Sequence, residues 1–195
     1  PPCEPCHPAD SSAPRCHTGL RWNPDYLVDP PGNSMTYFYN KESNNYVFDT
    51  AGNRDRNIAS YTSGGRLDRI EYGTRAGSES TGSAPAKVVF TTSPRCITSL
   101  ATPDSWCSSA QTSTDSNKWL DTPTDLMCSA EPCTNYSPVF FDRYRLNDVS
   151  TVAYDGTAYQ PVDAWGIQQR FVASGTSGLE NAVSPMLITT GITRT

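Results

Sequence analysis

The amino-acid sequence predicts an all-β fold, mainly antiparallel hairpins that form a curled sheet, with long loops braced by disulfides. Good helix formers are sparse, since the 195 residues include 13 Gly and 16 Pro beside only 3 Lys and 6 Glu. Several segments alternate apolar and polar side chains with the period of a strand. The 7 cysteines of this polar chain indicate an oxidising compartment, in which disulfides form.

Composition and charge exclude several classes of protein. The length fits one domain or two small ones. A formal net charge of -5 and a pI near 4.9 argue against nucleic acid as a partner. The longest apolar run is about four residues, far short of the ~20 that a membrane-spanning helix needs. We therefore expect no nucleic-acid partner and no membrane span.

The first half of the chain divides into two segments. Residues 1–20 are rich in Pro, Cys and His and are expected to form a stapled loop, that is, a loop held together by disulfide bonds. Residues 21–92 are expected to be a β-hairpin region, with its first strand at 20–28 and its second at 34–40. Residues 41–60 are polar, and we expect them to form a long excursion.

Further strands are predicted along the rest of the chain. Those at 66–73 and 86–92 are expected to face each other across a Gly/Ser-rich loop. Residues 93–138 are rich in Cys, Ser and Thr and are expected to be a loop insertion with one helical turn near 124–128. Residues 139–195 are expected to be a second β-hairpin region. Its strands are predicted at 143–154, 164–172 and 187–195, with a hairpin turn at 155–156.

The seven cysteines allow many pairings, which the spacing alone does not resolve. One set, Cys6–Cys16, Cys96–Cys107 and Cys128–Cys133, would close three short local loops. Loops of this kind stabilise a fold by roughly 2–3 kcal/mol each in the chain-entropy model. In this set Cys3 is left over, either free or paired with a cysteine outside this stretch of chain.

The amino-terminal cluster has three interpretations. Cys3-x-x-Cys6-His7 matches the C-x-x-C-H word of haem c attachment, which makes a small c-type cytochrome a remote alternative. The three cysteines of this segment, with His7 or His17, would also suit a tetrahedral zinc site. Proline-rich spacing and an oxidising compartment favour a disulfide-stapled loop instead. We therefore expect no metal site and no cofactor.

Acidic residues offer candidates for hydrolytic catalysis by type alone. These are Glu42, Asp68 and Glu71. Asp68 and Glu71 lie three apart on a predicted strand, so alternation should place them on opposite sides of the sheet. We interpret them as solvated strand charges, predict no catalytic residue and expect that the chain is not an enzyme.

Aromatic residues of one predicted hairpin suggest a binding surface. Trp22 comes from its first strand, and Tyr37 and Tyr39 share one face of its second. Aromatic rings in such a row can stack on a sugar, although they more often pack across strands inside a sheet. A carbohydrate-binding β-module that uses these three residues is therefore an alternative function.

A short pattern recurs along the chain, in which a Gly- or Asp-containing turn leads into a strand with outward aromatics. It occurs at 29–39 and 64–72, and more loosely at 145–159. These units resemble the tyrosine-aspartate (YD) repeats of RHS proteins. A row of such hairpins would stack into one curled antiparallel sheet.

The resemblance extends to an ordered series of short motifs over nearly the whole chain. The motifs are Glu4-Pro5-Cys6-His7, Arg21-Trp22-Asn23-x-Asp25-Tyr26, Gly64-Gly65-x-Leu67-x-Arg69-Ile70-x-Tyr72-Gly73, Ala84-Pro85-Ala86, Arg95-Cys96, Trp119-x-Asp121-x-Pro123-x-Asp125-x-x-Cys128, and Ser137-Pro138-x-Phe140 followed by Arg143-x-Arg145-Leu146. In this order they are similar to a block in large secreted RHS-repeat proteins of actinobacteria, which are polymorphic-toxin-like.

The resemblance implies a non-catalytic structural segment, upstream of or merging into a shell of YD repeats. In that family the repeats form a hollow β-shell that encloses or presents a toxin or other cargo. The expected partner is then the remainder of the parent chain, into which residues 139–195 would continue. The expected location is extracellular or at the cell surface.

Overall fold

The computed structural model describes residues 19, 21–50, 53–79, 81–102, 104–108, 115–128, 133–173 and 185–195; for 48–50 and 53–57 it describes the backbone alone. Apart from residue 19, the predicted stapled loop of residues 1–20 lies outside these ranges, as do the Cys6–Cys16 pair and the haem and zinc candidates at residues 3–17.

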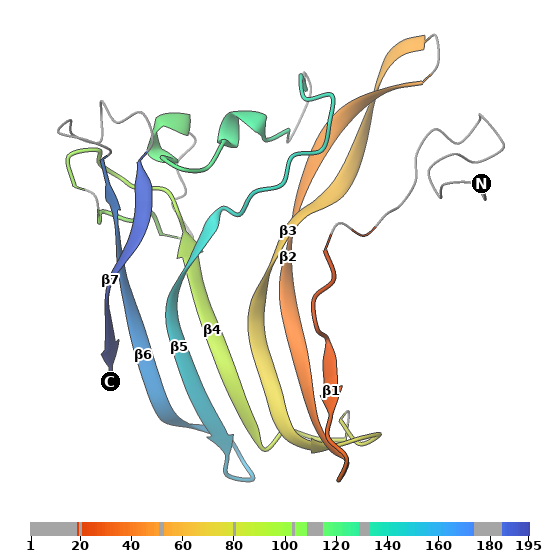
Figure 1. The fold of residues 1–195 in the computed structure, drawn as a ribbon, viewed down its shortest axis with the longest axis vertical. Helices are drawn as coiled ribbons and strands as arrows, with labels where there is room; N and C mark the ends of the chain where they lie inside the picture. The colour runs from red at the N-terminus through yellow and green to blue at the C-terminus, as the bar shows by residue number, and fades with distance from the viewer. Residues whose placement is uncertain are drawn as a thin grey trace.

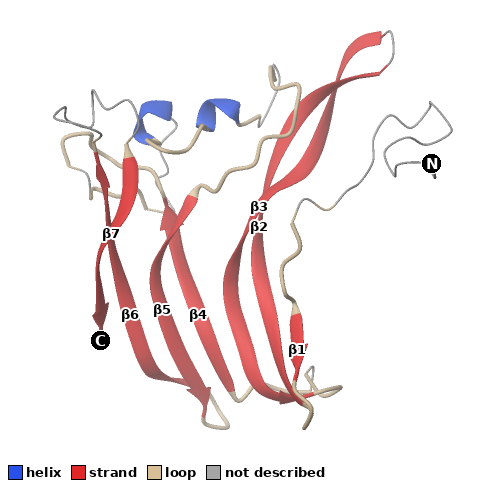
Figure 2. Cartoon of the chain, viewed as in Figure 1, coloured by secondary structure: helices blue, strands red, loops and turns tan. Residues whose placement is uncertain are grey.

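The described chain is all-β, as predicted, and its seven strands form one antiparallel sheet (Figures 1 and 2). The strands are β1 (Tyr26–Val28), β2 (Asn33–Thr50), β3 (Asn53–Arg75), β4 (Ala86–Pro94), β5 (Tyr144–Tyr154), β6 (Tyr159–Val172) and β7 (Met186–Arg194). Each strand pairs with the next along the chain, so the order in the sheet is β1 to β7. The sheet curls, with β1 at one edge and β7 at the other.

One sequence prediction for the first hairpins is wrong, and a second is incomplete. The first strand is only Tyr26–Val28 rather than 20–28, and Pro24, which has no N–H to donate, lies just before it. The excursion expected at 41–60 is a pair of strands: residues 41–50 belong to β2 and residues 53–60 to β3, and the two pair from Lys41↔Gly65 to Thr50↔Asn53. This long two-stranded ribbon extends past the rest of the sheet (Figure 1). Its polar sequence has no apolar stripe, so the hydrophobic period could not reveal it.

The loop insertion has little regular structure in its described parts. A 3₁₀ helix, η2 (Thr124–Leu126), forms the predicted helical turn, and a second one, η1 (Ser116–Lys118), was not predicted. Both helices lie at one end of the sheet (Figure 2). Within the described residues we find no helix that is long and apolar enough to cross a membrane.

The strand register gives the sheet two different faces. One face, here called the apolar face, follows cross-strand rows such as Tyr37–Ile70–Val88 and Phe90–Val149–Trp165. Its members are Met35, Tyr37, Tyr39, Leu67, Ile70, Tyr72, Ala86, Val88, Phe90, Val149, Thr151, Ala153 and Trp165. All of them are half-buried. The centre of the molecule is therefore a single layer rather than two packed layers.

Fully buried apolar side chains gather at the end of the sheet that carries the cysteine-rich loops. They form three small groups. The groups are Val47 with Cys128 and Cys133, Cys96 with Cys107 and Trp119, and Ile97 with Phe171. The core of this chain thus lies under its disulfide loops, and not along the middle of its strands.

Gly73 lies at a bulge of β3 and has a φ of 81°, in the left-handed region that favours glycine. A Cβ at this position would lie 3.3 Å from Cβ of Pro85. We expect Gly73→Ala to lower the free energy of unfolding by about 2 kcal/mol, measured by urea titration. Gly77 is the matched control, because its φ is 83° but a Cβ there meets nothing within 4 Å. An equal loss in Gly77→Ala would show that the Pro85 contact contributes nothing.

Candidate functional site

The three predicted sugar-binding aromatics do not form one uniform platform. Trp22 lies before β1 and is 90% exposed. Tyr37 and Tyr39 share the apolar face of β2, as alternation predicted, but both are half-buried within its rows. The hydroxyl of Tyr39 donates a hydrogen bond to the carbonyl of Pro24 at 2.9 Å. The tyrosines therefore have structural contacts of their own, and Trp22 is the most open ring of the three.

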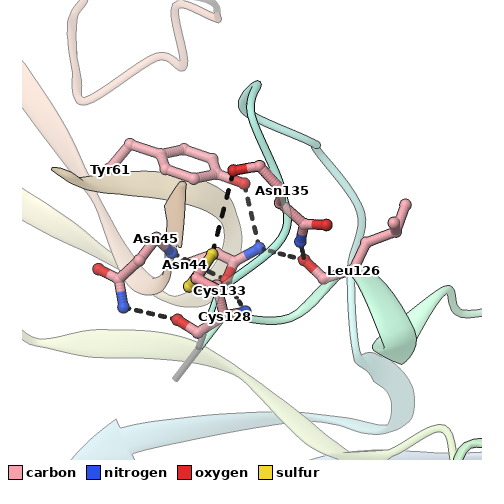
Figure 3. The surroundings of a disulfide bond; sticks show 7 residues. All are labelled: Asn44, Asn45, Tyr61, Leu126, Cys128, Cys133 and Asn135. Carbon is pink, nitrogen blue, oxygen red and sulfur yellow. Dashed lines mark hydrogen bonds between the residues drawn. A yellow bond between two sulfur atoms is a disulfide. The ribbon is translucent and has the colours of Figure 1, made fainter. Parts of the chain in front are cut away.

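Two disulfides, Cys96–Cys107 and Cys128–Cys133, brace the loops at the buried end of the sheet. Both match the pairs that the sequence suggested. The first closes the turn in which Ile97 forms a β-bridge with Trp106. Beside the second, Leu126, Cys128 and Asn135 are hydrogen-bonded to the β2–β3 ribbon (Figure 3). Each disulfide joins two residues of the same irregular segment, so it restrains that segment rather than linking it to a strand.

Asn44 is the polar centre of the second loop contact, and it is 2% exposed. Its Oδ1 accepts hydrogen bonds from the backbone N–H groups of Asn45 and Cys128, both at 2.8 Å. Its Nδ2 donates to the carbonyl of Leu126 at 3.0 Å and to the hydroxyl of Tyr61 at 3.1 Å. The amide therefore ties β2, β3 and the disulfide loop together (Figure 3).

Glu42 is the centre of a second buried group, which joins the two halves of the sheet. Its Oε1 lies 3.3 Å from Nη1 of Arg66, and its Oε2 lies 3.0 Å from Nε of Arg143. Arg66 also donates to Thr92 on β4 and stacks over the ring of Tyr144 on β5. Because β3 pairs with β4 over only four residues, this group holds the strands where they diverge. The carboxylate of Glu42 therefore forms ion pairs within the fold and is not exposed to solvent.

Burial, and secondly the carboxyl group of Asp142, raise the pKa of Glu42 above its ordinary value, against the opposing effect of Arg143. A raised pKa means that the folded state binds this proton more tightly than the unfolded state. Stability should therefore fall as the pH rises from about 4.3, the ordinary glutamate pKa, through the folded-state value.

We expect the stability of Glu42→Gln, relative to the wild type, to improve as the pH rises through this window, measured by urea unfolding at a series of pH values. Glu79→Gln is the control of opposite sign, because a hydrogen bond from Tyr26 lowers the pKa of Glu79. A pH-independent difference for Glu42→Gln would contradict the assignment.

The prediction that Asp68 and Glu71 face opposite sides is wrong. Phe38 pairs with Arg69 and Tyr39 pairs with Leu67, so Asp68 is an extra residue in a β-bulge. The bulge interrupts the alternation, and Arg69 forms ion pairs with both acids, at 3.1 Å to Asp68 and 2.9 Å to Glu71. These contacts make the acids part of a charged strand surface, in which Lys87 also binds Glu71 at 3.0 Å.

The described residues contain no candidate metal site. Among them, no group of three or more His, Cys, Asp or Glu side chains is arranged to hold a metal ion. The sequence did not point to the buried roles of Asn44 and Glu42, since a polar residue in a polar stretch carries no periodic signal. No protein family, curated protein or solved structure matches the chain.

Proposed function

We propose that this chain is a non-catalytic structural segment of a secreted RHS/YD-repeat protein, contributing to a β-shell that encloses or presents a toxin or other cargo. The observation that carries the proposal is a single curled layer of strands, paired in chain order, with one apolar face. The ordered sequence motifs support the choice of family.

The apolar face supports enclosure. A sheet face lined by Leu67, Ile70, Val88 and Phe90 normally packs on a second layer, because exposed apolar patches of this kind are unfavourable in water. In a closed shell the opposing walls and the contents of the shell would provide that cover. The opposite face carries Arg69, Glu71 and Lys87 and suits water.

The edge strand supports continuation into further repeats. In β7, the side chains of Met186 and Ile192 are 62% and 66% exposed. Among the described residues, β7 pairs with β6 alone. A nine-residue edge of this kind is a template for another strand, and single-domain proteins usually blunt or cover such edges. The next hairpin of the parent chain would occupy it.

Secretion fits the disulfides, which form in oxidising compartments. A structural role fits the acids, because Glu42, Asp68 and Glu71 all form ion pairs within the fold. The alternative, a carbohydrate-binding module at Trp22, Tyr37 and Tyr39, is weaker, because the tyrosine rings are half-buried in the apolar rows.

The proposal is tested by a structure of the complete secreted protein that carries this chain. We expect residues 186–194 to be hydrogen-bonded on their outer side to a further strand, and the apolar face to line an enclosed interior. A sheet whose β7 edge faces solvent, with its apolar face packed on a layer that encloses no space, would refute the proposal.

A further inference from the structure

A polar hollow opens where two neighbouring strands separate. The pairing of β5 with β6 ends at Asp148↔Gly166. Beyond this point β5 stays with β4, up to Tyr144↔Pro94, while β6 stays with β7. A cavity of about 370 Å³ lies in the gap, within the size range of small-ligand sites. It is lined mainly by Trp106, Arg145, Asn147, Asp148, Gln168 and Gln169.

The walls of this hollow are held in place. The guanidinium of Arg145 lies over the ring of Trp106, with Cζ 4.0 Å from the ring centroid. Trp106 in turn packs against the buried ring of Phe171, with the centroids 5.5 Å apart. The Cys96–Cys107 disulfide closes the loop that carries Trp106. A site that is ordered before binding loses less conformational entropy when a ligand arrives.

Two polar side-chain atoms in the wall of this hollow have no hydrogen-bond partner among the described residues. Only three buried side-chain polar atoms of the described residues lack a partner, and two of them, Arg145 Nε and Asn147 Oδ1, belong to residues of its wall. Buried polar atoms are nearly always paired, so such exceptions need a reason. The terminal torsion of an asparagine is soft, which allows Oδ1 of Asn147 to turn toward a donor in the cavity. The two buried atoms are thus one donor and one acceptor without a partner among the described residues.

The chemistry of the lining selects the class of ligand. Two guanidinium groups, Arg145 and Arg170, are balanced by the carboxylates of Asp104 and Asp148, which disfavours a strongly charged ligand. Because the lining combines amide, guanidinium and carboxylate groups, it suits a ligand that both donates and accepts hydrogen bonds. Hydroxyl groups do both at one atom, and a sugar carries several side by side.

We propose that this cavity between β5 and β6 is a binding site for a neutral sugar unit. The site is separate from the three aromatics near β1 and does not depend on the proposed shell. The Trp106 side chain provides an apolar part of the wall, and the side chains of Asn147, Asp148 and Gln168 provide partners for hydroxyl groups.

The test is saturation-transfer NMR on the full chain with the methyl glycosides of glucose, galactose, mannose and N-acetylglucosamine. Inorganic phosphate and a blocked alanine peptide serve as the anionic and peptide probes. We expect at least one glycoside to give a saturation-transfer signal. In a separate protein NMR titration, the same glycoside should shift the assigned indole N–H resonance of Trp106. Silence of all four glycosides, or binding of phosphate or the peptide alone, would overturn the proposal.

Two variants locate the binding. Asn147→Leu removes the amide, and Gly166→Val fills the floor, where a Cβ would lie 3.7 Å from Oδ1 of Asp148. Each is expected to weaken binding at least tenfold. Ala164→Val is the matched control, since it adds the same kind of side chain two residues away on β6, outside the lining. Unchanged binding in both correctly folded variants, with loss in Trp22→Ala, would instead place the sugar near β1.

Discussion

Replacing Phe171 with alanine is expected to lower the free energy of unfolding by about 4 kcal/mol, the usual scale for a fully buried phenylalanine. Phe171 is 0% exposed and lies near the end of β6. It packs with Ile97, and Trp106, Leu100 and Leu187 complete its surroundings. The described residues include few fully buried side chains, so this ring is a large share of what fixes the cysteine-rich loop to the sheet.

The measurement is urea unfolding of the wild type and two variants. Phe140→Ala is the matched control, because the Phe140 side chain is 47% exposed and contacts Tyr61 edge to face. We expect it to lose about 1 kcal/mol. Similar losses in Phe140→Ala and Phe171→Ala would show that the loop end of the sheet is not the core of this fold.

Replacing Asn44 with alanine is expected to cost about 3 kcal/mol, because buried backbone groups lose their partners. The N–H of Cys128 would lose the acceptor that lies 2.8 Å away. The carbonyl of Leu126 would lose one of its donors. Two hydrogen bonds to β2 and β3 would be lost as well, so the disulfide loop should detach from the ribbon while the disulfide itself remains.

The neighbouring Asn45→Ala provides the control for this second variant. Asn45 makes one side-chain hydrogen bond to the loop, to the carbonyl of Cys128 at 2.7 Å, and is only half-buried. We expect a loss of about 1 kcal/mol there. Proteolysis of the 126–139 segment should accelerate in Asn44→Ala alone. Equal sensitivity of the two variants would mean that Asn44 does not anchor the loop.

The parts of the fold with a clear apolar period were predictable from sequence. Residues 86–92 alternate around Val88 and Phe90, and they form β4 beside β3 as expected. The strands at 143–154 and 187–195 also match β5 and β7 within a residue. In these segments one face of the strand is apolar, which is the condition that makes a period of two visible.

The remaining features have no such signal. Residues 41–50 and 53–60 form a paired ribbon whose buried positions include the polar Glu42 and Asn44, so burial there leaves no apolar period in the sequence. The bulge at Asp68 depends on how β3 pairs with β2, so the local sequence around Asp68 does not predict it. The hollow beside Asn147 arises because β5 and β6 follow different neighbours, which is a property of the whole sheet. Sequence reasoning therefore found the strands with an apolar face, but not the polar ribbon or the polar sites between strands.

The most direct test of the shell proposal compares two adjacent positions of β4 in the complete secreted protein. Val88 pairs with Ile70 on the apolar face, whereas Val89 pairs with Arg69 on the opposite face of the sheet. We would measure labelling of Val88→Cys and Val89→Cys by a bulky polyethylene-glycol maleimide, relative to the wild type and to the denatured protein. Protection of Val88→Cys with labelling of Val89→Cys is predicted, because only the apolar face should line an enclosed interior. Rapid labelling of Val88→Cys in the native protein would contradict the account.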